Sequence, residues 1–282
     1  MKKFIAELNS SKADIRVLKS KIIDGKDIKL NGESIEDLWG FQENEDFKKL
    51  MKRCTIPEDK PFILWSDKGD IVYMSFADEL EDGQNLFYNH SSLGSFTTNL
   101  PNLTTAHRMF CMCDNMSFVH VDFPKLTNVV EMFYTCLKLE EFKGDLSSLE
   151  DGQYMFQNCY SMKRFDAEIP NLKGAINMFS GCALEEFKGD LTNLYVADNM
   201  FNKCKLNKES VLGIMEDINN SKTSDKICNI TLGIDKSLET DEDILRAIGS
   251  FQMNGNVIQV PTGQTITNTF GNNTWNITVQ WN

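Results

Sequence analysis

Five cysteines recur along the chain at an almost constant spacing, and this spacing limits the chemistry open to them. Successive steps are 23, 23, 23 and 22 residues, and the positions are Cys113, Cys136, Cys159, Cys182 and Cys204. A zinc site needs ligand pairs about two to four residues apart, and only Cys111 and Cys113 lie that close. The alternatives are a redox or metal ladder and a column of small buried side chains. We favour the column, with all five thiols reduced.

Other reactive side chains form no catalytic pattern. The three histidines, His90, His107 and His120, belong to no His-Glu-x-x-His motif, and neither a Gly-x-Ser-x-Gly elbow nor a phosphate-binding glycine loop occurs. The acidic run Asp241–Asp243 could suggest calcium, but an acidic first turn of a helix accounts for it equally well. The sequence therefore predicts a protein with no enzymatic activity, no cofactor and no metal ion.

Charge and hydropathy exclude two further classes. The chain has 29 basic and 41 acidic residues, a net charge of −12, whereas nucleic acids and anionic membranes bind basic surfaces. No apolar run approaches the roughly 18 residues of a transmembrane helix, and the opening Met1–Glu7 lacks the apolar stretch of a secretory signal. We expect no nucleic acid partner, no membrane insertion and no export by a cleaved signal.

The cysteines belong to a longer repeated unit. A Met-Phe pair precedes each of them, at residues 109, 132, 155, 178 and 200, and Leu86-Phe87 supplies a sixth copy. The unit is Met-Phe-x-x-Cys-x-x-Leu-x-x-Phe-x-x-x-Leu-x-x-Leu followed by a polar stretch. A unit this short cannot bury its apolar side chains alone, but stacked copies share one core. We therefore expect a solenoid with one parallel strand per coil and with Phe142, Phe165 and Phe187 stacked inside.

This repeat resembles the leucine-rich repeats of the BspA-like family. The matching segments in one coil are Met132–Cys136 and Leu139–Phe142, and the resemblance extends over residues 72–206. It implies an α/β fold, a leucine-rich-repeat solenoid of six coils of about 23 residues. It also implies a role in protein–protein or surface contact.

The segments on either side of the repeat have different patterns. Before it, we expect two helices, at 34–39 and 45–54, and a hairpin of residues 62–65 and 71–76. After it, we expect helix 208–218, strand 226–233, helix 240–248 and strand 275–281. The predicted division is an α+β N-terminal attachment or capping region (1–71), the solenoid (72–206) and a small α/β C-terminal cap (207–282).

The C-terminal pattern is also similar to that of a group of phage-encoded and commensal-bacterial proteins. The matching residues are Leu206, Glu209–Val211, Asn229–Gly233 and Leu238–Ile248. Such proteins are often fibre or other virion components of phages of gut bacteria, so the resemblance implies a location in a virion. The alternatives are a bacterial leucine-rich-repeat adhesin at the cell surface and a cytoplasmic scaffold.

Partner contacts are expected at two places. The first is the outward face of the strands, which carries one row of four residues and another of three: His120, Lys143, Asp166, Lys188; and Glu141, Arg164, Glu186. A merely solvated charged face would have the same composition. The second is the N-terminal segment, because 13 of the 29 basic residues lie within residues 1–60. We expect residues 1–30 to pack on another chain, either in a homo-oligomer or on a virion neighbour; the alternative is folding back on their own solenoid.

Overall fold

The structure is a computed structural model. It describes residues 77–91, 93–223, 228–249, 261–267 and 273–282 in full, and elsewhere only the backbone of short strands.

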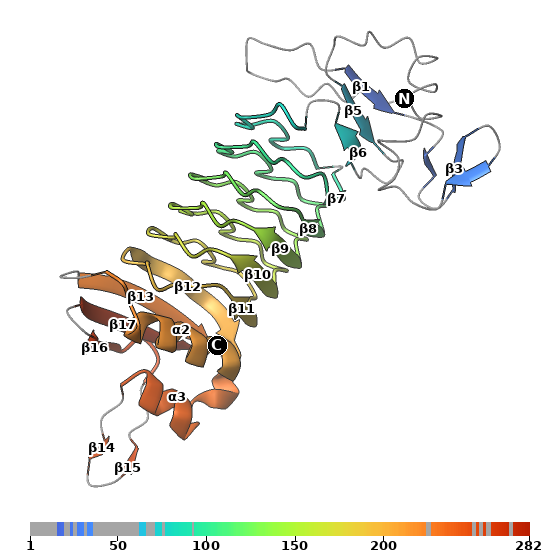
Figure 1. Ribbon diagram of the computed structural model, residues 1–282. Coiled ribbons are helices and arrows are strands. Elements are labelled where there is room, and N and C mark those ends of the chain that lie inside the picture. Colours follow the sequence, from blue (N-terminus) through green and yellow to red (C-terminus); the bar gives the residue numbers. More distant parts are fainter. Residues whose placement is uncertain are drawn as a thin grey trace.

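Stacked coils form the centre of the molecule (Figure 1). Each contributes one strand to a parallel sheet in the order β11-β10-β9-β8-β7. The strands are β7 (Ser95–Phe96), β8 (Phe118–His120), β9 (Glu141–Asp145), β10 (Arg164–Glu168) and β11 (Glu186–Lys188). Phe142 lies beside Phe165, and Phe165 beside Phe187, so the register follows the repeat of the sequence. The predicted parallel strands are confirmed.

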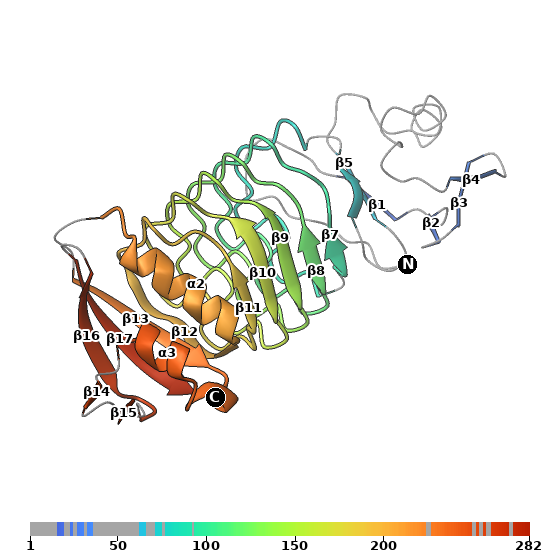
Figure 2. The same cartoon turned by 60° about the horizontal axis from the view of Figure 1, so that its bottom comes forward.

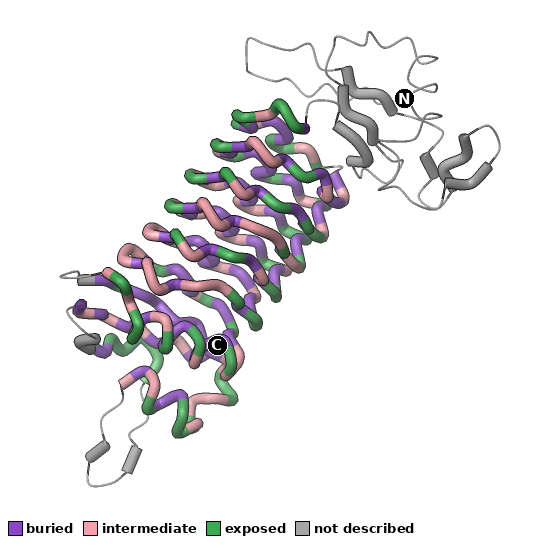
Figure 3. The backbone as a smooth tube through the Cα atoms, in the orientation of Figure 1, coloured by how far each residue is buried: buried purple, intermediate pink, exposed green. Residues whose placement is uncertain are grey.

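Two columns of phenylalanines fill the interior, which Figure 3 shows as the buried inner surface of every coil. Phe142, Phe165 and Phe187 stack with ring centroids 5.7 and 5.5 Å apart, as predicted. The phenylalanines of the Met-Phe pairs form the second column, with separations of 5.1 to 5.6 Å from Phe87 to Phe201. The columns meet edge to face, an arrangement favoured by aromatic quadrupoles.

The Met-Phe segments are turns that hold a fixed backbone shape. In each coil two residues four positions apart have positive φ, such as Asn85 and Asn89, or Glu131 and Thr135. The N–H of each Met-Phe phenylalanine from Phe87 to Phe179 donates to the methionine carbonyl of the next coil, at 2.8 to 2.9 Å. The coils are therefore joined by backbone hydrogen bonds on the turn side as well as in the sheet.

The periodic cysteines line the interior beside this turn column. All five are free and buried, as predicted. Each Sγ donates to the carbonyl oxygen of a phenylalanine in the preceding coil, at 3.0 to 3.3 Å; Cys159 Sγ, for example, lies 3.1 Å from Phe133 O. Burial raises the pKa of every one of these thiols. They are interior hydrogen-bond donors in their protonated form.

Helix α2 (Lys208–Asn219) closes the C-terminal edge of the parallel sheet, lying along β11 in Figure 2. Ser210 Oγ accepts from the Phe187 N–H at 2.9 Å and donates to Glu185 O at 3.3 Å. Asp217 Oδ2 accepts from the Leu191 N–H at 2.9 Å. Two side chains of the helix thus satisfy N–H groups that another strand would otherwise satisfy.

Replacing Ser210 tests this closure. We expect Ser210→Ala to lower the free energy of unfolding by about 1–2 kcal/mol, because the buried Phe187 N–H loses its acceptor. Chemical denaturation measures the change. Ser117→Ala is the matched control, since Ser117 Oγ only donates to Gly94 O, which also accepts the Ser117 N–H. Its loss should cost about 0.5 kcal/mol or less. Equal effects of the two changes would contradict the closing role.

A second sheet continues the turn side of the solenoid. Its order is β12-β13-β17-β16, with β12 (Ala197–Leu206), β13 (Ile227–Ile234), β17 (Asn273–Trp281) and β16 (Thr265–Phe270). The remaining elements of this region are η2 (Lys236–Leu238), α3 (Glu242–Ala247), β14 (Gln252–Met253) and β15 (Asn256–Val257). The element types expected at 208–218, 226–233, 240–248 and 275–281 are all observed, with shifted ends. The domain division at 71/72 and 206/207 stays a proposal.

Two short sheets are described before the repeat. One joins β1 (Arg16–Lys19), β5 (Phe62–Trp65) and β6 (Ile71–Met74), and the other joins β2 (Ile23–Asp24), β3 (Asp27–Leu30) and β4 (Glu33–Ile35). The expected hairpin is confirmed as β5–β6.

One N-terminal prediction needs correction. The helix expected to begin at Ser34 is wrong there, because β4 pairs antiparallel with β3. The sequence Asn31-Gly32 between these strands favours a two-residue hairpin connection over a helix cap. Residues 16–19 pair with β5 of the same chain, outside the solenoid, and the packing of residues 1–30 on another chain stays a prediction. The helix expected at 45–54 lies outside the described residues.

Candidate interaction surface

The register of the strands aligns the predicted contact residues in two rows. His120, Lys143, Asp166 and Lys188 are successive partners across β8 to β11, as the sequence predicts. Glu141, Arg164 and Glu186 form the neighbouring row. All seven side chains are exposed or half-buried, so both rows face outward. Their role as a contact surface stays a prediction.

Glu141 is the centre of an ion-pair network in the second row. Its Oε2 accepts from Arg164 Nε at 3.0 Å and Nη2 at 2.6 Å, and its Oε1 lies 3.4 Å from His120 Nε2. The hydrogen bond from Arg164 is the main reason that the pKa of Glu141 lies below its usual value. The same bond raises the pKa of Arg164. The network links β8, β9 and β10 and fixes the orientation of three charged side chains.

An exposed aromatic side chain begins the second row. Phe118 is 39% exposed and pairs with Glu141 in the register, and its ring centroid lies 5.3 Å from that of His120. It is not among the contact residues predicted from the sequence. Counting back 23 residues from Glu141 would have found it, because Phe118 occupies the same position in the preceding coil. Aromatic residues and arginine are enriched among the anchors of protein interfaces.

An open depression of about 640 Å³ lies beside the first row. Lys143, Asp166 and Lys188 line it, together with a further set of acidic residues: Asp122, Asp145, Glu168 and Asp190. Its hollow shape comes from Gly144, Ala167 and Gly189, which leave the strand surface low at this point. The acidic set is not among the residues predicted from the sequence, although the spacing of 23, 23 and 22 residues would have found it.

Charge in the depression is unbalanced. Five carboxylates face two lysines, so the lining has a net charge of 2 − 5 = −3. Within the part of the chain that the structure describes, none of these seven side chains forms an ion pair. Asp122, Asp145 and Asp190 each accept a backbone N–H of this chain. The depression thus presents carboxylates beside two lysines, a mixed charge pattern that fits a polar partner whose acidic groups meet the lysines and whose basic groups meet the carboxylates.

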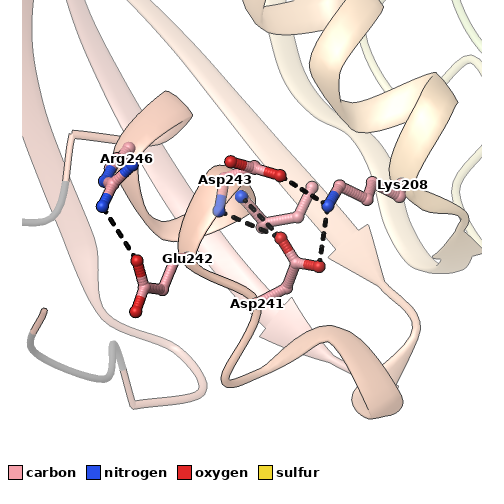
Figure 4. Close-up of polar contacts among 6 residues, drawn as sticks. Lys208, Asp241, Glu242, Asp243 and Arg246 are labelled. Carbon is pink, nitrogen blue, oxygen red and sulfur yellow. Dashed lines mark hydrogen bonds and ion pairs between the residues drawn. The ribbon is translucent and has the colours of Figure 1, made fainter.

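The acidic run considered for calcium has a structural role instead (Figure 4). Asp241 caps α3, since its Oδ1 accepts from the N–H groups of Asp243 and Ile244 at 3.0 and 3.2 Å. Lys208 Nζ lies 2.9 Å from Asp241 Oδ2 and 2.7 Å from Asp243 Oδ2. The hydrogen bond from Lys208 is the main cause of the lowered pKa of Asp241. This contact ties the start of α2 to the start of α3. Among the described residues, no group of three or more His, Cys, Asp or Glu side chains is arranged to hold a metal ion.

Comparison with known families identifies the repeat. Residues 81–208 match the BspA type leucine rich repeat region in six copies. Searches of curated proteins and of solved structures found no significant match. No helix in the described part has the length and apolar character needed to cross a membrane. Repeat regions of this family are generally non-enzymatic and point to protein–protein or surface binding. The segment 81–208 of this chain is therefore a leucine-rich repeat region of the BspA type.

Proposed function

We propose that the chain is a non-enzymatic structural and binding protein whose strand face, β8–β11, contacts a protein partner or a host surface. We place it in a bacteriophage virion, as a fibre or decoration component. Its partners are then further copies of the chain or other virion proteins, with no nucleic acid contact and no membrane insertion. No cofactor enters this role.

The observation that carries the binding role is the composition of the strand face. An exposed aromatic side chain, Phe118, and the oriented Arg164–Glu141 pair lie on the same face as the acidic depression with its two lysines. A face selected for solubility alone needs charge, but it needs neither an exposed phenylalanine nor a hollow of this size. Together these features provide an apolar anchor, directional hydrogen bonds and a charge pattern.

The virion placement rests on the sequence around the end of the repeat. Residues 206–250 resemble segments of phage-encoded proteins, and they contain the closing helix α2 and the strand β13. The two alternatives make different predictions. A bacterial adhesin binds host cells but is absent from phage particles. A cytoplasmic scaffold neither binds host cells nor occurs in phage particles.

A double charge reversal tests the binding face. Lys143→Glu with Lys188→Glu changes the pattern of the first row without touching the core, since both lysines are exposed. We expect binding to particles or host cells to weaken roughly tenfold or more. The matched control reverses Lys125 and Lys138, two exposed lysines outside the strand face that bond to Asn102 and Asn115. It makes the same change in net charge and should leave binding within about twofold of the original.

Titration of labelled chain against particles and host cells gives both numbers. If the two double variants weaken binding equally, only net charge matters and the strand face has no specific role. If neither variant weakens it, the partner contacts another surface. Unchanged unfolding curves for both variants ensure that folding is not the cause.

A further inference from the structure

The last strand of the C-terminal sheet has a free edge. β16 pairs antiparallel with β17 over six residue pairs, from Thr265↔Thr278 to Phe270↔Asn273. Its other edge has no strand partner among the described residues. Free N–H and C=O groups along a strand of this length are a template for another strand.

Nothing in the sequence of β16 protects this edge. Residues 265–270 contain no proline, no lysine and no charged side chain. The parallel sheet is different, because Ser210 and Asp217 of α2 satisfy N–H groups at its β11 edge. Helix α2 therefore covers the β11 edge of the parallel sheet. In the part of the chain that the structure describes, no comparable element covers the β16 edge of the C-terminal sheet.

A chain of side-chain hydrogen bonds runs across the sheet to this edge. Asn229 Nδ2 donates to Asp198 Oδ1 at 3.0 Å, and Asn276 Nδ2 donates to Asn229 Oδ1 at 2.9 Å. Thr267 Oγ1 then donates to Asn276 Oδ1 at 2.8 Å. Thr267 is exposed, and its hydroxyl oxygen still has acceptor capacity on the outer side. This series of hydrogen bonds ends at the Thr267 hydroxyl, which can accept a further hydrogen bond from an added strand.

The three strands on the β16 side of this sheet are uncharged, although the molecule as a whole is acidic. β13, β16 and β17 contain no Asp, Glu, Lys or Arg, although the whole chain carries a net charge of −12. Two copies of so acidic a chain repel each other at most orientations. An approach through β16 places uncharged Thr and Asn residues against one another and avoids that repulsion.

We infer that β16 pairs antiparallel with β16 of a second copy across a twofold axis. Residues directly opposite each other in an antiparallel pair point their side chains to the same face of the sheet. The twofold axis therefore lies where one residue faces its own copy, and not midway between two sequence positions. An axis at Thr267 pairs position 265 with position 269, which sets threonines against threonines along the row. Cross-strand threonine pairs are favourable, and a twofold contact is self-complementary. The β16 pairing specifies how copies of the chain associate, which the proposed function leaves open. It does not depend on binding through the strand face of the solenoid.

Sedimentation equilibrium of the full chain tests the pairing. We expect a concentration-dependent dimer, and Thr267→Lys should raise its dissociation constant roughly tenfold or more, because two lysines meet near the axis. Asn219→Lys is the matched control: it adds the same charge at an exposed position of α2, outside the sheet. It should change the dissociation constant by less than about threefold.

Three results would overturn the inference. One is a monomer at every concentration up to roughly 0.1 mM. Another is an equal effect of Thr267→Lys and Asn219→Lys, which would indicate that only the net charge matters. The third is a dimer that Thr267→Lys leaves intact while its unfolding curve is unchanged. The double reversal of Lys143 and Lys188 should leave the dimer unaffected, so failure of the strand-face proposal and failure of this one are distinguishable.

Discussion

Above about pH 9 the folded chain should lose stability steeply, because the five periodic thiols are buried in its core. An unfolded cysteine has a pKa of about 8.5, whereas burial raises the pKa of each periodic cysteine in the folded state. A folded pKa above the unfolded one gives a contribution that is fully present below pH 8.5 and lost as the pH rises. Each thiol then contributes about 1.4 kcal/mol per pH unit, and five contribute about 7 kcal/mol per unit.

Urea denaturation under reducing conditions at pH 7, 9 and 10 measures this slope. Cys159→Ala is the informative variant. At pH 7 it should cost about 1–2 kcal/mol through lost packing, and its loss of stability should be smaller by about 1.4 kcal/mol per pH unit. Thiol labelling provides a second measurement, because the five periodic cysteines should react slowly in the native chain and quickly in denaturant. Stability that does not change between pH 7 and 10, or fast native labelling of all five, would contradict a buried column.

Gly144→Ala should be among the most damaging single changes in the solenoid. Gly144 lies in β9 with φ of +156°, and a Cβ atom there would be 1.8 Å from the carbonyl oxygen of Val121 in the preceding coil. Neither backbone can move away, because Val121 N–H donates to Lys143 O at 3.1 Å and Phe123 N–H donates to Asp145 O at 2.8 Å. Strain and overpacking together should lower the free energy of unfolding by about 3–5 kcal/mol.

Gly213→Ala is the matched control, because the same chemical change should have the opposite sign. Gly213 is exposed in the middle of α2, and nothing lies within 4 Å of the Cβ it would gain. Alanine there should stabilise the chain by about 1 kcal/mol through its higher helix propensity. Chemical denaturation of the two variants gives both values. A Gly144→Ala chain as stable as the original would show that neighbouring coils are not spaced as the structure has them.

The repeat made the solenoid predictable from the sequence. A constant 23-residue step aligns every buried position, so the phenylalanine stacks, the cysteine column and the two outward rows all follow from it. The same spacing also lists Phe118 and the acidic residues of the depression. It selects them as contact residues only after the strand face has been identified as a binding surface. Periodicity says which residues repeat and not which of them bind.

The ends of the solenoid were less predictable, because the repeat stops there. Ser210 stands 23 residues after Phe187, yet it lies on a helix and not on a further strand. The sequence predicted that helix but not that its side chains close the sheet, since this depends on where α2 packs. At residues 33–35, a helix-cap pattern and an Asn-Gly hairpin signal overlapped, and the hairpin prevailed because β4 pairs with β3.

The placement of this repeat protein in a virion is the central proposal, and the composition of purified particles tests it most directly. On this proposal a phage encodes the chain, and its particles are banded on a density gradient and their proteins quantified by mass spectrometry. The account predicts peptides from residues 81–208 in every preparation, at a fixed ratio to the major structural proteins. A chain that is abundant in the infected lysate but missing from the banded particles would contradict it.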